Sequence, residues 1–146
     1  MTDERKGRSR HVELTIDQLV ELQPGLGRLM PDVGRRYWIL YYAAQGGNWP
    51  LAAYQLRQLR HLFTLGATTR PKMAQHLRAF QSGTFDPLEA AIGAEDWPEF
   101  DRRFRAGIQS ANQFHITTNH PEIRWQLPRT PPEDLDLGEP RSSGKE

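Results

Sequence analysis

The chain contains no cysteine among its 146 residues. This absence excludes disulfide bonds, thiolate metal sites, cysteine nucleophiles and covalent thioether attachment of haem. The fold must therefore be stabilised by a core of buried apolar side chains. A chain of this length with 37% hydrophobic residues is long enough to form such a core without cross-links, and it predicts one ordinary domain.

Long apolar runs are also missing. No stretch approaches the roughly 18 apolar residues that span a bilayer. The N-terminal segment lacks the apolar run of roughly 7–15 residues that marks a signal peptide. We therefore expect a cytoplasmic protein that has no membrane-bound part.

The chain has no large excess of charge of either sign. The net charge is +1 and the pI is about 8.2, well below the basic balance of most nucleic-acid-binding domains. Glu99 and Asp101 lie just before the arginines at positions 102, 103 and 105, and no helix-turn-helix spacing is present. We expect these arginines to form a solvated face, and we expect no nucleic-acid partner. They are Arg57, Arg60, Arg102, Arg103 and Arg105.

Motifs for nucleotide binding, metal binding and catalysis are absent as well. Neither a phosphate-binding nor a dinucleotide-binding glycine motif occurs. The histidines at positions 11, 61, 76 and 120 form no Glu-x-x-His or His-x-x-x-His pair, so no metal site is predicted. No catalytic residue can be named. An enzyme stays an alternative, because catalytic triads assemble from residues far apart in sequence.

The chain does contain apolar residues that recur every three or four positions, which predicts amphipathic helices. Pro31 predicts that the first helix begins or bends there, and Gly46 and Gly47 predict its end. A third helix is expected to open at Pro71 and to bend near Asp86-Pro87. The first apolar stripe comprises Leu26, Met30, Val33, Tyr37, Leu40 and Ala44.

A weak internal repeat relates residues 43–50 to residues 91–98. Each copy places an N-cap residue, Asn48 or Asp96, two positions before a proline, as expected where a new helix starts after a short turn. Two helical hairpins that each expose an apolar stripe are satisfied by packing together. The sequence therefore predicts an all-α, antiparallel four-helix bundle, with Trp49 and Trp97 plugging one end.

The two ends of the chain are poor in apolar residues. Residues 1–13 and 129–146 are therefore predicted to be disordered, with the bundle domain spanning residues 14–128. Within that domain, Ile123, Trp125 and Leu127 alternate with polar residues after Pro121. This period of two predicts an extended strap with one face packed.

From about residue 26 to 127 the chain resembles helical-bundle proteins related to the class II c-type cytochromes, the cytochrome c-prime family. In many members, a Cys-x-x-Cys-His motif near the end of the last helix attaches haem. The corresponding residues here are 111–115, which lack both cysteines and retain His115. The segments that carry the resemblance are Leu29-Met30-Pro31, residues 37–44, residues 47–54 and residues 110–128.

His115 completes an apolar stripe on the last predicted helix, so its ring should face the interior. One interpretation is a buried histidine that hydrogen-bonds a neighbouring group. The alternative is noncovalent haem binding with His115 as the iron ligand, as the resemblance implies. The aromatic residues Phe114, Trp38 and Tyr41 are the predicted neighbours of such a site, although their rings could instead fill its volume.

These observations favour a cofactor-free, non-catalytic module that binds a protein partner or itself. The density of aromatic residues between positions 37 and 42 predicts that at least one of them lies at a groove or a subunit contact, because such residues are common at interfaces. The resemblance implies a homodimer through the first two helices, since bundles of that family often pair. A noncovalent carrier or sensor of haem or another small ligand, using His115, is the alternative.

Overall fold

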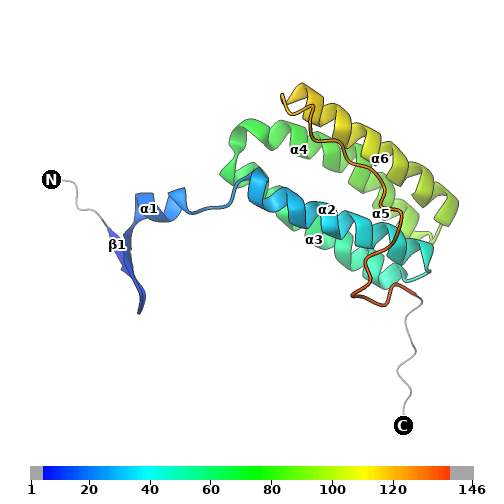
Figure 1. The fold of residues 1–146 in the computed structure, drawn as a ribbon, viewed down its shortest axis with the longest axis horizontal. Helices are drawn as coiled ribbons and strands as arrows, with labels where there is room; N and C mark the ends of the chain where they lie inside the picture. Colours follow the sequence, from blue (N-terminus) through cyan, green and yellow to red (C-terminus); the bar gives the residue numbers. More distant parts are fainter. Residues whose placement is uncertain (1–4, 139–146) are drawn as a thin grey trace, which may run out of the picture.

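A computed structural model of the chain describes residues 5–138, and most of these residues lie in helices. The prediction of a mostly helical protein is confirmed. A small N-terminal arm precedes a helical domain (residues 26–117), and an extended segment follows along the surface of that domain (Figure 1). Within residues 5–138, no helix combines the length and apolar character required to cross a membrane.

The first helical hairpin consists of α2 (Leu26–Gln45) and α3 (Trp49–Thr69). The expectation that α2 starts at Pro31 is wrong, because the helix begins at Leu26 and contains this proline. Proline lacks the N–H that would bond to the carbonyl of Gly27, one turn before. Pro31 is exposed, so that carbonyl remains accessible to water.

The second helical hairpin is formed by several short helices and one long helix. Its first half comprises the 3-10 helix η1 (Pro71–Met73), α4 (Ala74–Phe80), the π-helix η2 (Gln81–Phe85) and α5 (Asp86–Gly93). The long second half is α6 (Trp97–Thr117). The sequence predicts a bend at Asp86-Pro87, and in the structure the irregularity is the π-helix η2 immediately before it. The wider turn of a π-helix accommodates the proline ring and the hydrogen bond that proline cannot donate.

The two hairpins have equivalent connections, as the internal repeat predicts. Gly47 and Glu95 occupy the same position in the two turns and have positive φ values of 78° and 51°. Asn48 and Asp96 then cap α3 and α6 by accepting hydrogen bonds from backbone N–H groups three residues later. Glu95 adopts a conformation that favours glycine, so the second turn is the more strained of the two.

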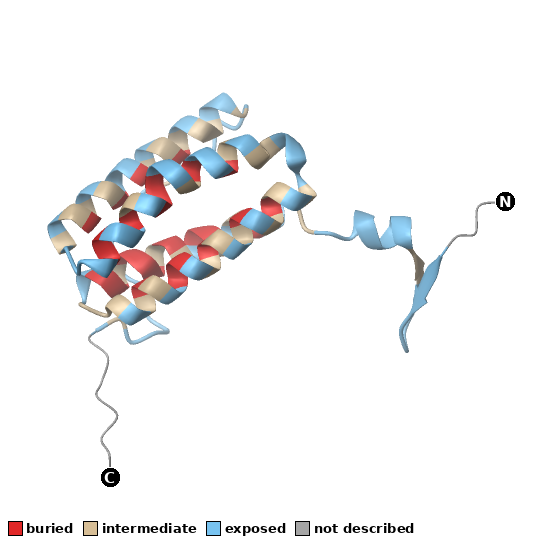
Figure 2. Ribbon diagram, turned by 180° about the vertical axis from the view of Figure 1, so that it is seen from behind, coloured by how far each residue is buried: buried red, intermediate tan, exposed pale blue. Residues whose placement is uncertain are grey.

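The core lies between the helices, where their apolar stripes meet (Figure 2). At one end of it, Trp49 and Trp97 both pack on the ring of Phe100, at centroid distances of 6.1 and 6.0 Å. These contacts place both turn tryptophans at the same end of the domain, as the repeat predicts. The largest fully buried side chains are Tyr37, Phe85, Phe100, Phe104, Leu40, Leu59, Leu88 and Val33.

The N-terminal arm differs from the sequence prediction. An antiparallel hairpin of β1 (Lys6–Arg8) and β2 (Glu13–Thr15) occupies most of the segment expected to be disordered, and the short helix α1 (Ile16–Glu21) follows it. The arm points away from the helical domain, which starts at Leu26 rather than near residue 14 (Figure 1). The disorder predicted for residues 1–4 lies outside the described residues.

The segment after α6 contains no helix or strand, as predicted for an extended strap. We use the name strap for residues 121–138, because the segment stays against the domain for ten residues beyond the predicted end at residue 128. The Tyr42 hydroxyl donates to the carbonyl of Pro128, and Arg35 pairs with Asp134. The backbone at Leu137 also lies close to Gly46. Residues 139–146, predicted to be disordered, lie outside the described residues.

Candidate functional site

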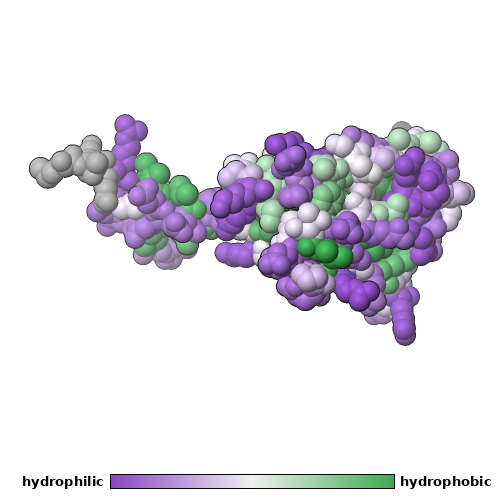
Figure 3. Space-filling model, turned by 90° about the horizontal axis from the view of Figure 1, so that it is seen from above, coloured by the Kyte–Doolittle hydropathy of each residue, from purple (hydrophilic) through white to green (hydrophobic). Residues whose placement is uncertain are grey.

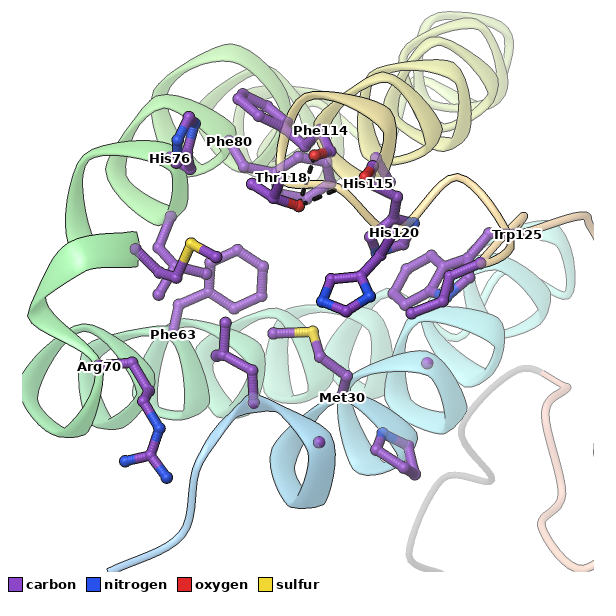
Figure 4. A pocket seen from close by; sticks show the side chains of 18 of the residues that line it. Met30, Phe63, Arg70, His76, Phe80, Phe114, His115, Thr118, His120 and Trp125 are labelled. Carbon is purple, nitrogen blue, oxygen red and sulfur yellow. Dashed lines mark hydrogen bonds between the residues drawn. The ribbon is translucent and has the colours of Figure 1, made fainter.

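An open pocket of about 770 Å³ lies at the end of the helical domain where the N-terminal arm joins it. Its walls come from the start of α2, the end of α3, α4, the end of α6 and the strap (Figure 4). The volume is within the range of roughly 300–1,000 Å³ that is typical of small-molecule sites.

Most of the pocket wall is apolar. Gly34 lines it as a buried residue, and a Cβ at this position would be in ordinary van der Waals contact with Trp125 and Trp38, at 3.7 and 3.8 Å. Such a wall removes apolar ligand surface from water, which contributes roughly 25 cal/mol per Å². The apolar residues that line the pocket are Leu26, Gly27, Met30, Pro31, Gly34, Trp38, Phe63, Met73, Leu77, Phe80, Ala111, Phe114, Ile123 and Trp125.

The polar side chains of the wall are basic or neutral, and no Asp or Glu of residues 5–138 lines it. Of these side chains, Arg35 is paired with Asp134, and the Thr118 hydroxyl donates to the carbonyl of Phe114 at 2.8 Å. This composition suits an apolar ligand that is neutral or carries negative charge. The polar lining residues are Arg35, Arg70, His76, His115, Thr118 and His120.

His115 is the polar group of this wall with an unmet bonding requirement. Its Nδ1 atom is buried and has no hydrogen-bond partner within the described part of the chain. Burial lowers the pKa of the His115 imidazole, although the backbone of Ile123 opposes this shift, so the neutral ring is favoured. A neutral imidazole can donate through one nitrogen and accept, or bind a metal, through the other.

Asn112 fixes the strap beside His115. Its side-chain amide donates to the carbonyl of Trp125 at 2.9 Å and accepts from the Trp125 N–H at 2.6 Å. This paired contact sets the position of the Trp125 indole, whose centroid lies 6.0 Å from the ring of His115 and 5.5 Å from that of Trp38. These two hydrogen bonds from α6 therefore hold the strap in place as one wall of the pocket.

Three of the four residues predicted to surround a ligand do line the pocket: His115, Phe114 and Trp38. Tyr41, the fourth, does not line it. Its hydroxyl donates to Asp101 at 2.8 Å and accepts from Arg105, at a position outside the lining of the pocket. Burial and the neighbouring Asp101 raise the pKa of the Tyr41 hydroxyl.

The aromatic rings leave the pocket open rather than filling it. Phe114 packs edge-on against His76 at 5.6 Å and against Phe80 at 6.3 Å, so it belongs to the wall. Trp38 of α2 and Trp125 of the strap, whose ring centroids are 5.5 Å apart, form a second aromatic wall.

Sequence reasoning did not assign His76, His120, Met30 or Met73 to this site. His120 follows the turn that ends α6, where Asn119 has a positive φ of 66° and the His120 N–H donates to the His115 carbonyl at 2.7 Å. Such a closed turn returns His120 to the end of the helix that carries His115. The Asn-His-Pro sequence of residues 119–121 was the signal available for this placement.

Within residues 5–138, no group of three or more His, Asp or Glu side chains is arranged to hold a metal ion. Comparison with known proteins gives neither a family nor a function for the chain. No family model matches the chain, and no curated protein or solved structure is significantly similar to it.

Proposed function

We propose that the helical domain is a non-catalytic binding module that holds an apolar small molecule in this pocket, without a covalent bond. Haem is the leading candidate ligand, and His115 is the residue proposed to contact its iron. The observation that carries this proposal is the unpartnered Nδ1 of His115 in the wall of an open apolar pocket. A buried polar atom without a partner costs about 1–3 kcal/mol, and a bound ligand that reorganises the ring can remove that cost.

The residues present fit a noncovalently bound haem. The pocket volume and the flat indole rings of Trp38 and Trp125 suit a planar macrocycle, and the basic lining without carboxylates suits its acidic substituents. Iron would supply one or two open coordination positions, of which a neutral imidazole can fill one. The protein's own contribution is to bind the apolar ring, exclude water and hold His115 in its neutral form.

The arrangement of the helices supports the same proposal. We propose that the two helical hairpins form an antiparallel four-helix bundle, and that the resemblance to the cytochrome c-prime family reflects an ancestry in which the attachment cysteines were lost. In such a bundle, ligand sites are built in the core from side chains of facing helices. Here they lie on α2, α3, α4 and α6.

The test is a titration of the full chain with haemin, followed by absorption in the Soret region. The proposal predicts a saturable shift at one haemin per chain. His115→Ala should weaken binding by at least the roughly 10–100-fold that metal sites lose when a supporting residue is removed. His61→Ala is the matched control, since His61 is exposed on α3 and does not line the pocket.

Two results would contradict the proposal in different ways. The absence of any Soret shift would exclude haem as the ligand. An identical shift in the wild-type chain and in His115→Ala would exclude ligation by His115. Iron-free protoporphyrin separates the two contributions, because it tests the apolar pocket without a metal bond.

A further inference from the structure

The N-terminal arm (residues 5–22) exposes an unusual density of large apolar side chains. Five of the nine exposed large hydrophobic residues in the described part of the chain lie within eleven positions of the arm. Isolated apolar residues on a surface need no explanation, whereas a cluster of them marks an interaction site. The five residues are Val12, Ile16, Leu19, Val20 and Leu22.

Three of these side chains lie on one face of α1, and the helix has no buried residue of its own. Ile16, Leu19 and Val20 share one face of α1, by their spacing of three and four residues. No residue of α1 is buried, although a capping box between Thr15 and Gln18 closes its N-terminus. Figure 3 shows apolar side chains of the arm at the molecular surface, beyond the helical domain.

Elements of this size are not stable alone. A two-stranded hairpin is marginal in water, and a helix of six residues is far shorter than the roughly 12–15 residues that isolated helices need. The strands and α1 of the arm therefore require a partner surface to stay folded.

The base of the arm is held against the helical domain at Pro24 and Gly25. The Thr69 hydroxyl donates to the carbonyl of Pro24 at 2.7 Å, and the Gly25 carbonyl accepts the first hydrogen bonds of α2. The Arg70 guanidinium packs so closely on Gly25 that a Cβ there would overlap it. The three residues 23–25 thus set the direction in which the arm leaves the domain.

The charges of the arm are separated along its length. Within residues 5–15, the hairpin region carries Arg5, Lys6, Arg8 and Arg10 against Glu13, which pairs with Lys6 at 3.7 Å, and the acids Asp3 and Glu4 precede this stretch in the sequence. The helix α1 carries Asp17 and Glu21 with no basic residue, and neither acid has an ion pair within residues 5–138. The arm is therefore basic at one end and acidic at the other.

We infer that the partner of the arm is the arm of a second copy of this chain. A two-fold axis pairs identical surfaces in opposite directions. Antiparallel pairing of two arms places the basic hairpin of each copy beside the acidic α1 of the other, and it lets the apolar faces of both α1 helices cover each other. This interface differs from the homodimer through the first two helices that the family resemblance implies, and it is independent of ligand binding in the pocket.

The experiment measures the mass of the full chain by light scattering across a concentration series. The expected mass is twice the 16.8 kDa of one chain, falling to that of the monomer on dilution. Val20→Glu places a charge in the apolar face and should raise the dissociation constant by about tenfold or more. Tyr54→Glu is the matched control, because Tyr54 is also exposed but lies on α3.

Charge reversal tests the antiparallel pairing itself. The double variant Arg8→Glu, Arg10→Glu should weaken the dimer, and so should Asp17→Arg, Glu21→Arg. The chain that carries all four changes regains opposite charges at its two ends and should regain the dimer. The helical content of each variant, measured by circular dichroism, should stay close to that of the wild-type chain, since no residue of α1 belongs to the core.

A monomeric mass at all concentrations would overturn the inference, and so would a dimer that Val20→Glu leaves unchanged. A dimer weakened by Val20→Glu but not restored by the fourfold charge exchange would overturn the antiparallel pairing. A monomer that captures a different protein through the arm would equally count against a second copy as the partner.

Discussion

Gly107 of α6 is the position where the packing of the helical domain leaves least room. A Cβ added there would overlap the hydroxyl of Tyr37 and would lie 2.6 Å from Cγ2 of Thr84. Tyr37 cannot move aside, because its ring is fully buried and stacks on Phe104 at a centroid distance of 4.0 Å. Its hydroxyl also donates to the Phe104 carbonyl at 3.1 Å. Gly107→Ala therefore tests whether α2, η2 and α6 pack as described.

The expected effect combines three contributions. Alanine in a helix is favoured over glycine by about 1 kcal/mol. Overpacking a well-filled core costs about 1–3 kcal/mol, and a buried hydroxyl that loses its acceptor costs about 1–3 kcal/mol. We expect a net destabilisation of about 3 kcal/mol, which lowers the melting temperature of a chain of this size by roughly 6–12 °C.

Urea unfolding of the wild-type chain and Gly107→Ala, with an unchanged dependence on denaturant, gives this difference directly. Gly34→Ala is the control, since its added Cβ meets neighbours at no less than 3.7 Å and should leave the stability equal or slightly higher. Adding Tyr37→Phe removes the overlapping hydroxyl, so the cost of Gly107→Ala should fall by about 1 kcal/mol or more in that background. A Gly107→Ala chain as stable as the wild type would refute the described packing.

Two further predictions concern the pocket. Asn112→Ala removes both hydrogen bonds to the Trp125 backbone and should lower the free energy of unfolding by about 1–3 kcal/mol, with a change in tryptophan fluorescence as the strap detaches; unchanged emission and stability would contradict its role. Because burial lowers the pKa of His115, the unfolded chain binds the proton more readily than the folded chain. Stability should therefore fall as the pH drops below the ordinary histidine value of about 6.5. His115→Gln should lose less stability than the wild type between about pH 7 and pH 5 in denaturant titrations.

Sequence patterns predicted the starts of α3 and α6 well, because these boundaries depend on local chemistry. The caps at Asn48 and Asp96 and the turns before them act within a few residues, so their effects are readable from sequence. The N-terminal arm was missed for the converse reason. Two strands of three residues and a helix of six are too short to show a period, and the arm has few apolar residues before Val12.

The pocket could be predicted only in part. The spacing on α6 placed His115 on the inner face, but the open volume beside it depends on the distances between helices, which no spacing encodes. Tyr41 shows the same limit, because its position is set by Asp101, 60 residues away in sequence. Trp38 lies about one turn before Tyr41 on the same helix and lines the pocket. The sequence around these two residues therefore could not show that one lines the pocket and the other does not.

The central claim is that the pocket, rather than a surface elsewhere, holds the ligand. Gly34→Leu and Gly93→Leu test it most directly, because the first adds a side chain inside the pocket and the second adds the same side chain where no atom lies within 4 Å. The dissociation constant for haemin should rise by about tenfold or more in Gly34→Leu, a loss of at least about 1.4 kcal/mol, and stay unchanged in Gly93→Leu. Equal affinities in both variants, with the helical content preserved, would contradict the claim.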